Sequence, residues 1–294
     1  MIYENVNENN ISKPKKQVRF FEYKFINLDE NKLELYNPNL KLFEFKMAQN
    51  YKPNSDNFII NYGNDYFAFF KRLGDVNYII IQHDNEKIII GTACAILRKY
   101  SGKKNNQIPF WYLCDLKIEK KHRGQNLTKK LFRYMYRDFI KKSQRGYLIS
   151  MNDVSQQIIH IFDDISKIFV KKYILIKLLI YSVSVKIMKK IERFFKCAFE
   201  NISYLSLNGT KDIFSSTMEP IDLYHLQHGF FTATENTKKI DDLSENAIIM
   251  FCFPENSPLK SILDSMDVRT EINATIISWS MDFFDWHNIL TSDI

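Results

Sequence analysis

The stretch from Phe110 to Lys142 constrains the fold of this chain most strongly. Its beginning is crowded with apolar residues, as in a buried strand, and a basic turn around Gly124 follows. Beyond the turn, apolar residues recur at steps of three and four, the period of a helix that buries one face. These residues are Leu127, Leu131, Phe132, Met135, Tyr136 and Phe139. The stretch therefore predicts a strand, a turn and an amphipathic helix in direct succession.

The turn between this strand and helix has the composition of an anion site. The first turn of a helix carries unpaired backbone N–H groups and the positive end of the helix dipole, so it favours phosphate. Gly124 lets a ligand approach the backbone closely, and Lys120, Lys121 and Arg123 add positive charge. The local pattern leaves one alternative open, an ordinary connection with a solvated basic turn.

The run from Ile118 to Leu127, IEKKHRGQNL, resembles the acyl-CoA pyrophosphate loop of the GNAT acyltransferase superfamily. The usual form of that loop is (Gln/Arg)-x-x-Gly-x-(Gly/Ala). Here Lys121 takes the first place, Gly124 the glycine, and Asn126 replaces the second small residue, where N-myristoyltransferases also depart from the pattern. The resemblance implies that acyl-CoA contacts Leu116, Lys117, Ile118, Lys121, His122, Arg123, Gly124, Gln125, Asn126, Leu127 and Thr128.

Upstream blocks resemble the N-myristoyltransferase branch of that superfamily. Residues 42–51 resemble its "LYxLLxENY", residues 56–70 its "FRFDYSxEFLxWAL", and residues 89–96 its "LVGFISAIP", in the same order and at similar spacing. Residues 224–226 and 256–286 resemble later segments loosely. The resemblance implies an α+β fold, a mixed sheet flanked by helices, with two GNAT-like lobes in tandem. Residues 17–184 would form the acyl-CoA-binding lobe, and residues 185–294 a second, degenerate lobe for the acceptor.

The spacing of apolar residues and the positions of turn-forming residues predict the helices and strands in the rest of the chain. Residues 1–16 are too polar to bury a core, and we expect a disordered tail. Helices are predicted at 38–49, 57–73, 127–145, 154–169, 185–199, 237–243 and 257–266. Strands are predicted at 18–25, 76–82, 87–97, 110–118, 147–151, 172–184, 202–207, 211–215, 221–225, 247–253 and 275–281. Asn208-Gly209 predicts a hairpin between 202–207 and 211–215.

Acyl transfer to an amine needs a bound thioester, a base and donors for the tetrahedral oxyanion. The resemblance assigns the donors to the backbone N–H groups of Asp115 and Leu116, and the base to the carboxylate of Ile294. Asp293 is the alternative base. The alternative for Asp115 and Leu116 is that they simply belong to a core strand. The alternative for the chain end is an anchored tail with no role in catalysis.

Other proton carriers are less well placed in the sequence. The tyrosine with which many acetyltransferases protonate the leaving thiolate is absent near Phe162, where His160 is the nearest titratable residue. Tyr173 and Tyr181 stay open as candidates.

Charge and cysteine usage limit the partners. The 294-residue chain has a net charge of +7 and a pI near 9.0, which favours an anionic ligand: coenzyme A, nucleic acid or an acidic membrane. We expect Cys94, Cys114, Cys197 and Cys252, which form no CxxC pair, to be buried apolar residues in a reducing, cytoplasmic compartment. His225 and His228 lack further ligands, so no metal site is predicted. The apolar run 174–185 is too short for a transmembrane segment.

These observations favour an acyl-CoA-dependent N-acyltransferase that transfers a fatty, myristoyl-like acyl group to an amine, such as a peptide N-terminus. The expected partners are acyl-CoA, as co-substrate and not as a permanently bound cofactor, and a peptide or protein amine acceptor. The alternatives are an acetyl-CoA-dependent N-acetyltransferase and a non-catalytic module that binds CoA or nucleic acid. Nucleic acid is disfavoured because the basic residues are not interleaved with aromatic ones.

Overall fold

The computed structural model describes residues 23–49, 59–84, 86–101, 107–151, 172–199, 201–215, 219–233, 235–270 and 272–294. The predicted tail at 1–16 and the predicted helix at 154–169, which includes His160, lie outside the described residues.

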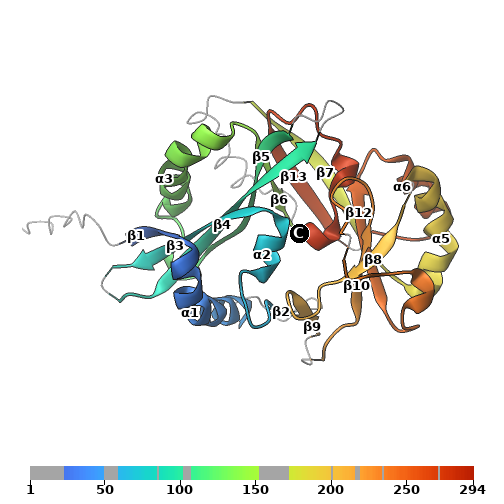
Figure 1. The fold of residues 1–294 in the computed structure, drawn as a ribbon, viewed down its shortest axis with the longest axis horizontal. Helices are drawn as coiled ribbons and strands as arrows, with labels where there is room; N and C mark the ends of the chain where they lie inside the picture. The colour runs from blue at the N-terminus through green and yellow to red at the C-terminus, as the bar shows by residue number, and fades with distance from the viewer. Residues whose placement is uncertain are drawn as a thin grey trace, which may run out of the picture.

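Within the described residues, eleven strands form one mixed sheet that runs through the molecule (Figure 1). The strand order is β1-β3-β4-β5-β6-β13-β7-β12-β10-β8-β11. The strands are β1 (Tyr23–Leu28), β3 (Asp75–His83), β4 (Ile89–Ser101), β5 (Gln107–Ile118), β6 (Gly146–Ser150), β7 (Tyr173–Ser184), β8 (Ser203–Ser206), β10 (Leu223–Gln227), β11 (Thr237–Lys238), β12 (Ile248–Pro254) and β13 (Ile272–Trp279). A separate antiparallel pair, β2 (Ile59–Asn61) and β9 (Asp212–Phe214), joins the two halves.

Helices cover the faces of this sheet. They are α1 (Glu30–Gln49), α2 (Ala68–Leu73), α3 (Leu127–Lys142), α5 (Val185–Ala198) and α6 (Pro258–Ser265), with short 3₁₀ helices η1 (Lys120–His122), η2 (Ile240–Asp242), η3 (Trp286–Asn288) and η4 (Thr291–Asp293). Side chains cap α5 and α6, because the hydroxyls of Ser184 and Ser257 accept N–H bonds in the first turns of these helices. In the described part of the chain, no helix is long and apolar enough to cross a membrane.

The two halves of the sheet repeat one pattern. In the first half, β5 and β6 are parallel, and β6 pairs antiparallel with β13. In the second half, β10 and β12 are parallel, and β12 pairs antiparallel with β7. The strand next to each parallel pair thus comes from the other half of the chain: β13 lies beside β6, and β7 lies beside β12. Strands β13 and β7 pair with each other in the middle of the sheet. This is the GNAT fold in two tandem lobes that the resemblance implied, whereas the boundary at residue 184 stays a prediction.

The structure corrects the predicted helix at 57–73. Only α2 is helical there, and residues 59–61 form β2 instead. Gly63 has a φ of +60° and donates its N–H to Asn61 Oδ1 at 3.0 Å, so a turn separates the two elements. The pairing of β2 with β9, from the far half of the chain, outweighs local helix propensity.

Other corrections also arise from long-range pairing and burial. The predicted helix at 237–243 is strand β11 followed by η2, because Thr237 and Lys238 pair with β8. The hairpin expected around Gly209 is absent, since β9 pairs with β2 and β8 pairs with β10 and β11. Helix α1 begins at Glu30 rather than at Pro38, which lies inside it, and Asp29 Oδ1 accepts the N–H of Lys32 at its start. Cys197 is exposed and not buried.

Strand β5 packs against different elements on its two faces. Trp111 and Leu113 face α3 and share a core with Leu127 and Leu131. Tyr112, on the other face, shares a core with residues of α1, α2 and the second lobe. Helix α3, which follows the basic turn, and the chain end therefore pack on opposite faces of β5.

Candidate active site

Strand β5 is irregular at the residues to which the resemblance assigned the oxyanion donors. Its register with β4 shifts between Thr92 and Cys94, so Asp115 and Leu116 together stand opposite one residue of β4. Asp115 has a φ of +52°, in the left-handed region that non-glycine residues rarely adopt. Thr92 Oγ1 donates to the Asp115 carbonyl at 2.9 Å and so fixes this bulge. A bulge of this kind redirects backbone groups away from the regular ladder.

Beyond the bulge, no strand among the described residues pairs with one edge of β5, and we call this edge open. Strand β6 pairs with β5 only from Trp111 to Leu113, whereas β5 continues to Ile118. The Glu119 N–H donates to the Ile90 carbonyl on β4 at 2.8 Å. Because backbone groups alternate along a strand, those of Leu116 and Ile118 face the edge that β6 has left. An extended ligand can pair with this edge.

The basic turn follows directly from the open edge. Gly124 has a φ of +78°, and a Cβ added there would meet no atom within 4 Å. Asn126 caps α3 in the left-handed conformation without a side-chain hydrogen bond to the helix. The side chains of Lys120, Lys121 and Arg123 are exposed, so the N–H groups of the first turn of α3 and three cations face solvent.

Two residues of the turn point inward and hold it in place. Glu119 is buried and pairs with Lys46 of α1 at 3.0 Å and with Lys121 at 3.7 Å. His122 is also buried, and its Nδ1 lies 3.2 Å from the Tyr23 hydroxyl of β1. Burial and the neighbouring Lys121 lower the pKa of His122.

A group of charged and phenolic side chains covers the bulge on the α1 and α2 face. The Asp115 carboxylate is buried and accepts from the hydroxyls of Tyr66, at 3.0 Å, and Tyr78. Lys117 Nζ lies 2.6 Å from Asp115 Oδ1 and 2.5 Å from Glu44 Oε2 on α1. Burial opposes the charge of Lys117, but Asp115, Tyr62 and Glu44 raise its pKa above the usual value. Lys117 therefore stays an ammonium.

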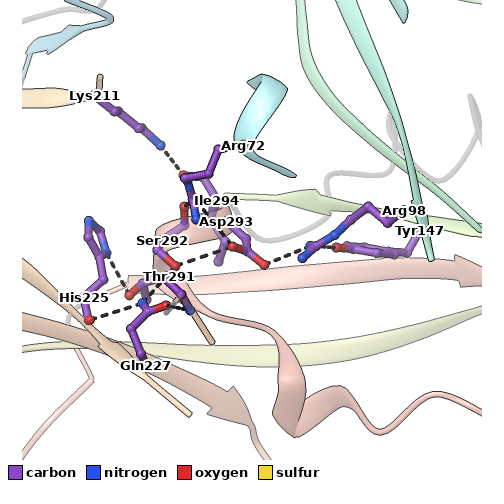
Figure 2. A network of polar contacts seen from close by, with 11 residues as sticks. Arg72, Arg98, Tyr147, Lys211, His225, Gln227, Thr291, Ser292, Asp293 and Ile294 are labelled. Atoms are coloured by element: carbon purple, nitrogen blue, oxygen red, sulfur yellow. Dashed lines mark hydrogen bonds and ion pairs between the residues drawn. The ribbon is translucent and has the colours of Figure 1, made fainter. Parts of the chain in front are cut away.

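The chain end reaches the same face of the sheet. Figure 1 shows the C-terminus at the centre of the molecule, and Figure 2 shows its polar contacts. Asp293 is 1% exposed and lies 2.8 Å from Arg98 Nη1 and 3.6 Å from Arg72 Nη2. Arg98 also donates to the Tyr147 hydroxyl at 3.2 Å. Two guanidinium groups thus hold the Asp293 carboxylate.

Lys211 links the chain end to strand β5. Its ammonium donates to the terminal carbonyl oxygen of Ile294 and lies 4.5 Å from the centre of the Phe69 ring. Burial, together with the neighbouring charge of Lys117, lowers the pKa of Lys211 to about 8, while Cys114 and Asp115 oppose the change.

Of the remaining candidates, His225 joins the polar network of the chain end (Figure 2). Tyr181 is buried in the core of the second half, where it stacks on Phe251 and Phe253, and burial raises its pKa to about 12. Tyr173 begins β7. His225 lies 3.0 Å from the Thr291 hydroxyl, and His228 stacks on Phe199. Among the described residues, no three His, Cys, Asp or Glu side chains gather as metal ligands would.

Sequence reasoning missed four charged residues of this region: Glu44, Arg72, Arg98 and Lys211. A weak signal existed for Arg98, which follows the apolar residues of β4, because a charged residue in such a run is buried only with a partner. Glu44 and Arg72 lie on helices where charge is ordinary, and only the tertiary fold brings them together.

The strand order, the bulged β5 with its open edge, and the basic turn before α3 define a two-lobed protein of the GNAT fold. No protein-family model matches the chain. Over 301 residues, the chain is 33% identical to the uncharacterized protein L340 of Acanthamoeba polyphaga mimivirus, covering 99% of this chain and 85% of L340. The chain belongs to the family of that protein.

Solved structures similar to this chain fall into two groups. N-myristoyltransferase of Saccharomyces cerevisiae with bound myristoyl-CoA and inhibitors is 12% identical, with coverage of 94% of this chain and 86% of that chain and a TM-score of 0.45. Glucosamine-6-phosphate N-acetyltransferase from Arabidopsis thaliana is 16% identical, with coverage of 49% and 90% and a TM-score of 0.34.

Proposed function

We propose that this protein is an acyl-CoA-dependent N-acyltransferase that transfers a fatty, myristoyl-like acyl group to an amine, in particular a peptide N-terminus. One observation carries the proposal: the bulged and open part of β5 leads directly into the Gly124 turn and the N-terminus of α3. A strand edge that can pair with an extended ligand and an anion site at its end match the pantetheine arm and pyrophosphate of coenzyme A.

In this proposal, each part of the site has a chemical role. The pyrophosphate lies at residues 121–128, and the pantetheine pairs along residues 116–118. The N–H groups of Asp115 and Leu116 donate to the oxygen of the thioester carbonyl, which gains negative charge when the amine attacks. The carbon–sulfur bond then breaks, and coenzyme A leaves as a thiolate that takes up a proton.

The base at the chain end stays a prediction. Of the two carboxylates considered from the sequence, that of Asp293 is unsuited, because Arg98 and Arg72 hold it. The Ile294 end lies beside Lys211, which donates to its terminal oxygen. The second lobe, which supplies both Lys211 and Ile294, would then contribute to the acceptor site.

Binding and turnover test the proposal together. We expect myristoyl-CoA to raise the melting temperature of the purified protein, since a ligand of the native state at about 100 times its Kd adds about 2.7 kcal/mol of stability. A library of peptides with free N-termini then serves as acceptor, with release of the CoA thiol and the mass of the product as readouts.

The alternatives predict different results in the same experiments. Stabilisation by acetyl-CoA but not by myristoyl-CoA would assign a short acyl donor. No stabilisation by either thioester would contradict the proposal. Submicromolar binding of short DNA or RNA at physiological salt, without CoA binding, would favour a non-catalytic module instead.

A further inference from the structure

The second half of helix α1 is fixed over β5 at the open edge. Lys46 pairs with Glu119 just beyond the end of β5, and Glu44 pairs with Lys117 just beyond the bulge. These two ion pairs lie on one helix, two residues apart, and fix it over the stretch of β5 along which we place the pantetheine arm, next to the proposed thioester position at Asp115 and Leu116. Glu44 is therefore held beside the proposed reaction centre.

The two carboxylates that share Lys117 differ in their surroundings. Asp115 has a side chain only 2% exposed, and Lys117 and two tyrosine hydroxyls occupy both of its oxygens. Glu44 has a side chain 15% exposed, and the bonds described for it all come from Lys117. Asp115 is thus a fixed part of the structure, whereas Glu44 can accept a further hydrogen bond from a ligand.

We propose that Glu44, rather than the Ile294 carboxylate, receives the acceptor's ammonium group and takes its proton, as the base of the acyl transfer. This inference rests on the proposed function and deepens it. The acceptor enters as R–NH₃⁺, and one N–H proton moves to the Glu44 carboxylate. The free amine attacks the thioester carbonyl, the carbon–sulfur bond breaks, and an amide forms. The thiolate takes the proton that Glu44 received, which returns Glu44 to a carboxylate, and the second proton of the nitrogen leaves to solvent.

The electrostatic surroundings suit this role. The titratable and charged groups that face Glu44 are Lys117 and Asp115 of β5, Lys211 from the connection before β9, and Tyr62 and Tyr66 from the segment before α2. Burial raises the pKa of Glu44, Lys117 opposes the increase, and Asp115 adds to it. A carboxylate of raised pKa accepts a proton more readily near neutral pH. When Glu44 is protonated, Lys117 keeps Asp115 as its counter-ion.

The test compares Glu44→Gln with the wild type in the full chain. Glutamine has the same shape but cannot take the proton, so we expect kcat to fall by about 100-fold or more, the usual contribution of a general base. The dissociation constant of myristoyl-CoA should stay within about twofold, since Glu44 faces the acceptor. Glu34→Gln, a change of an exposed glutamate on the same helix, is the matched control and should keep full activity.

The pH profile separates a base from a positioning residue. In the wild type, kcat/KM should fall on the acid side as Glu44 becomes protonated, and Glu44→Gln should lack this limb while Glu44→Asp retains it. Full turnover by a folded Glu44→Gln protein, with the acid limb intact, would overturn the inference and leave the proposed function standing. A wild type that binds no acyl-CoA would instead remove the proposed function itself.

Discussion

At the scale of single residues, the buried charges near the chain end depend on their partners. Arg98 is 4% exposed, and its partners are Asp293, the Tyr147 hydroxyl and the face of the Phe231 ring, 3.9 Å from the guanidinium carbon. Removal of one partner of a buried ion pair leaves the other charge desolvated, which costs more than the pair itself contributed. We therefore expect the η4 segment to contribute to the stability of the fold through the Arg98–Asp293 pair.

We expect Asp293→Asn to lower the free energy of unfolding by about 3–5 kcal/mol, because Arg98 would stay buried without its carboxylate. Urea unfolding measures the change. The control is Asp264→Asn, which removes the exposed i, i+4 pair with Lys260 on α6 and should leave the free energy of unfolding nearly unchanged. Equal losses of unfolding free energy in both variants would show that the Arg98–Asp293 pair stabilises the fold no more than an exposed pair does.

The anion site depends on Gly124. We expect Gly124→Asp to weaken acyl-CoA binding at least tenfold, because it places a carboxylate where the pyrophosphate would lie. The added Cβ has open space, and the strain of a φ of +78° costs about 1 kcal/mol, so the fold should survive. Titration with acyl-CoA measures the affinity.

Gly209 supplies a matched control for Gly124. It has a φ of +82° and equally open surroundings, so Gly209→Asp introduces the same charge and strain away from the turn. An unchanged dissociation constant in Gly124→Asp, or an equal loss in Gly209→Asp, would contradict the assignment of this loop.

At the scale of elements, the sequence predicted the helices and strands whose formation depends on residues close to them in the chain. The strand, basic turn and helix around Gly124 are present as β5, η1 and α3, because apolar spacing and a glycine act locally. Elements whose partners are remote were missed: β2 and β11 are strands only because β9 and β8 pair with them. The same holds for the site, where Asp115 and Leu116 followed from a motif, but Glu44 and Lys211 depend on tertiary contacts.

Two buried histidines in or beside β10 make stability depend on pH. Burial lowers the pKa of His225 to about 3 and that of His228 to about 4, so both are neutral in the folded protein at pH 5. The unfolded chain binds protons at these groups below about pH 6.5. Between pH 6.5 and 4 the unfolded state therefore binds more protons than the folded state. The free energy of unfolding decreases as the pH is lowered, by about 1.4 kcal/mol per pH unit for each histidine.

His228→Phe tests this dependence. The Nδ1 of His228 is buried and has no hydrogen-bond partner among the described residues, and phenylalanine preserves the stacking on Phe199. Urea unfolding at several pH values between 6 and 4.5 should give a slope about one proton smaller than in the wild type. An unchanged slope would mean that His228 is protonated in the folded protein.

At the scale of the whole molecule, the exchange of strands makes the lobes interdependent. Strand β7 belongs by sequence to the first lobe, but its two neighbours in the sheet, β13 and β12, both follow residue 184. Strand β13, in turn, lies between β6 and β7 and contributes Ile276 and Ile277 to buried clusters on both faces. The predicted division at residue 184 would therefore separate two repeats of one pattern, each of which lacks a strand without the other.

We expect the full chain to unfold in a single transition, with equal calorimetric and van't Hoff enthalpies, because neither lobe can complete its sheet alone. Residues 1–184 expressed by themselves should show no cooperative unfolding, since β7 would lose both neighbours and β6 would lose β13. Mixing this fragment with residues 185–294 should restore a cooperative transition if strand exchange is the cause. Calorimetry of the full chain that resolves two separate transitions, or a fragment 1–184 that unfolds cooperatively alone, would contradict the interdependence of the lobes.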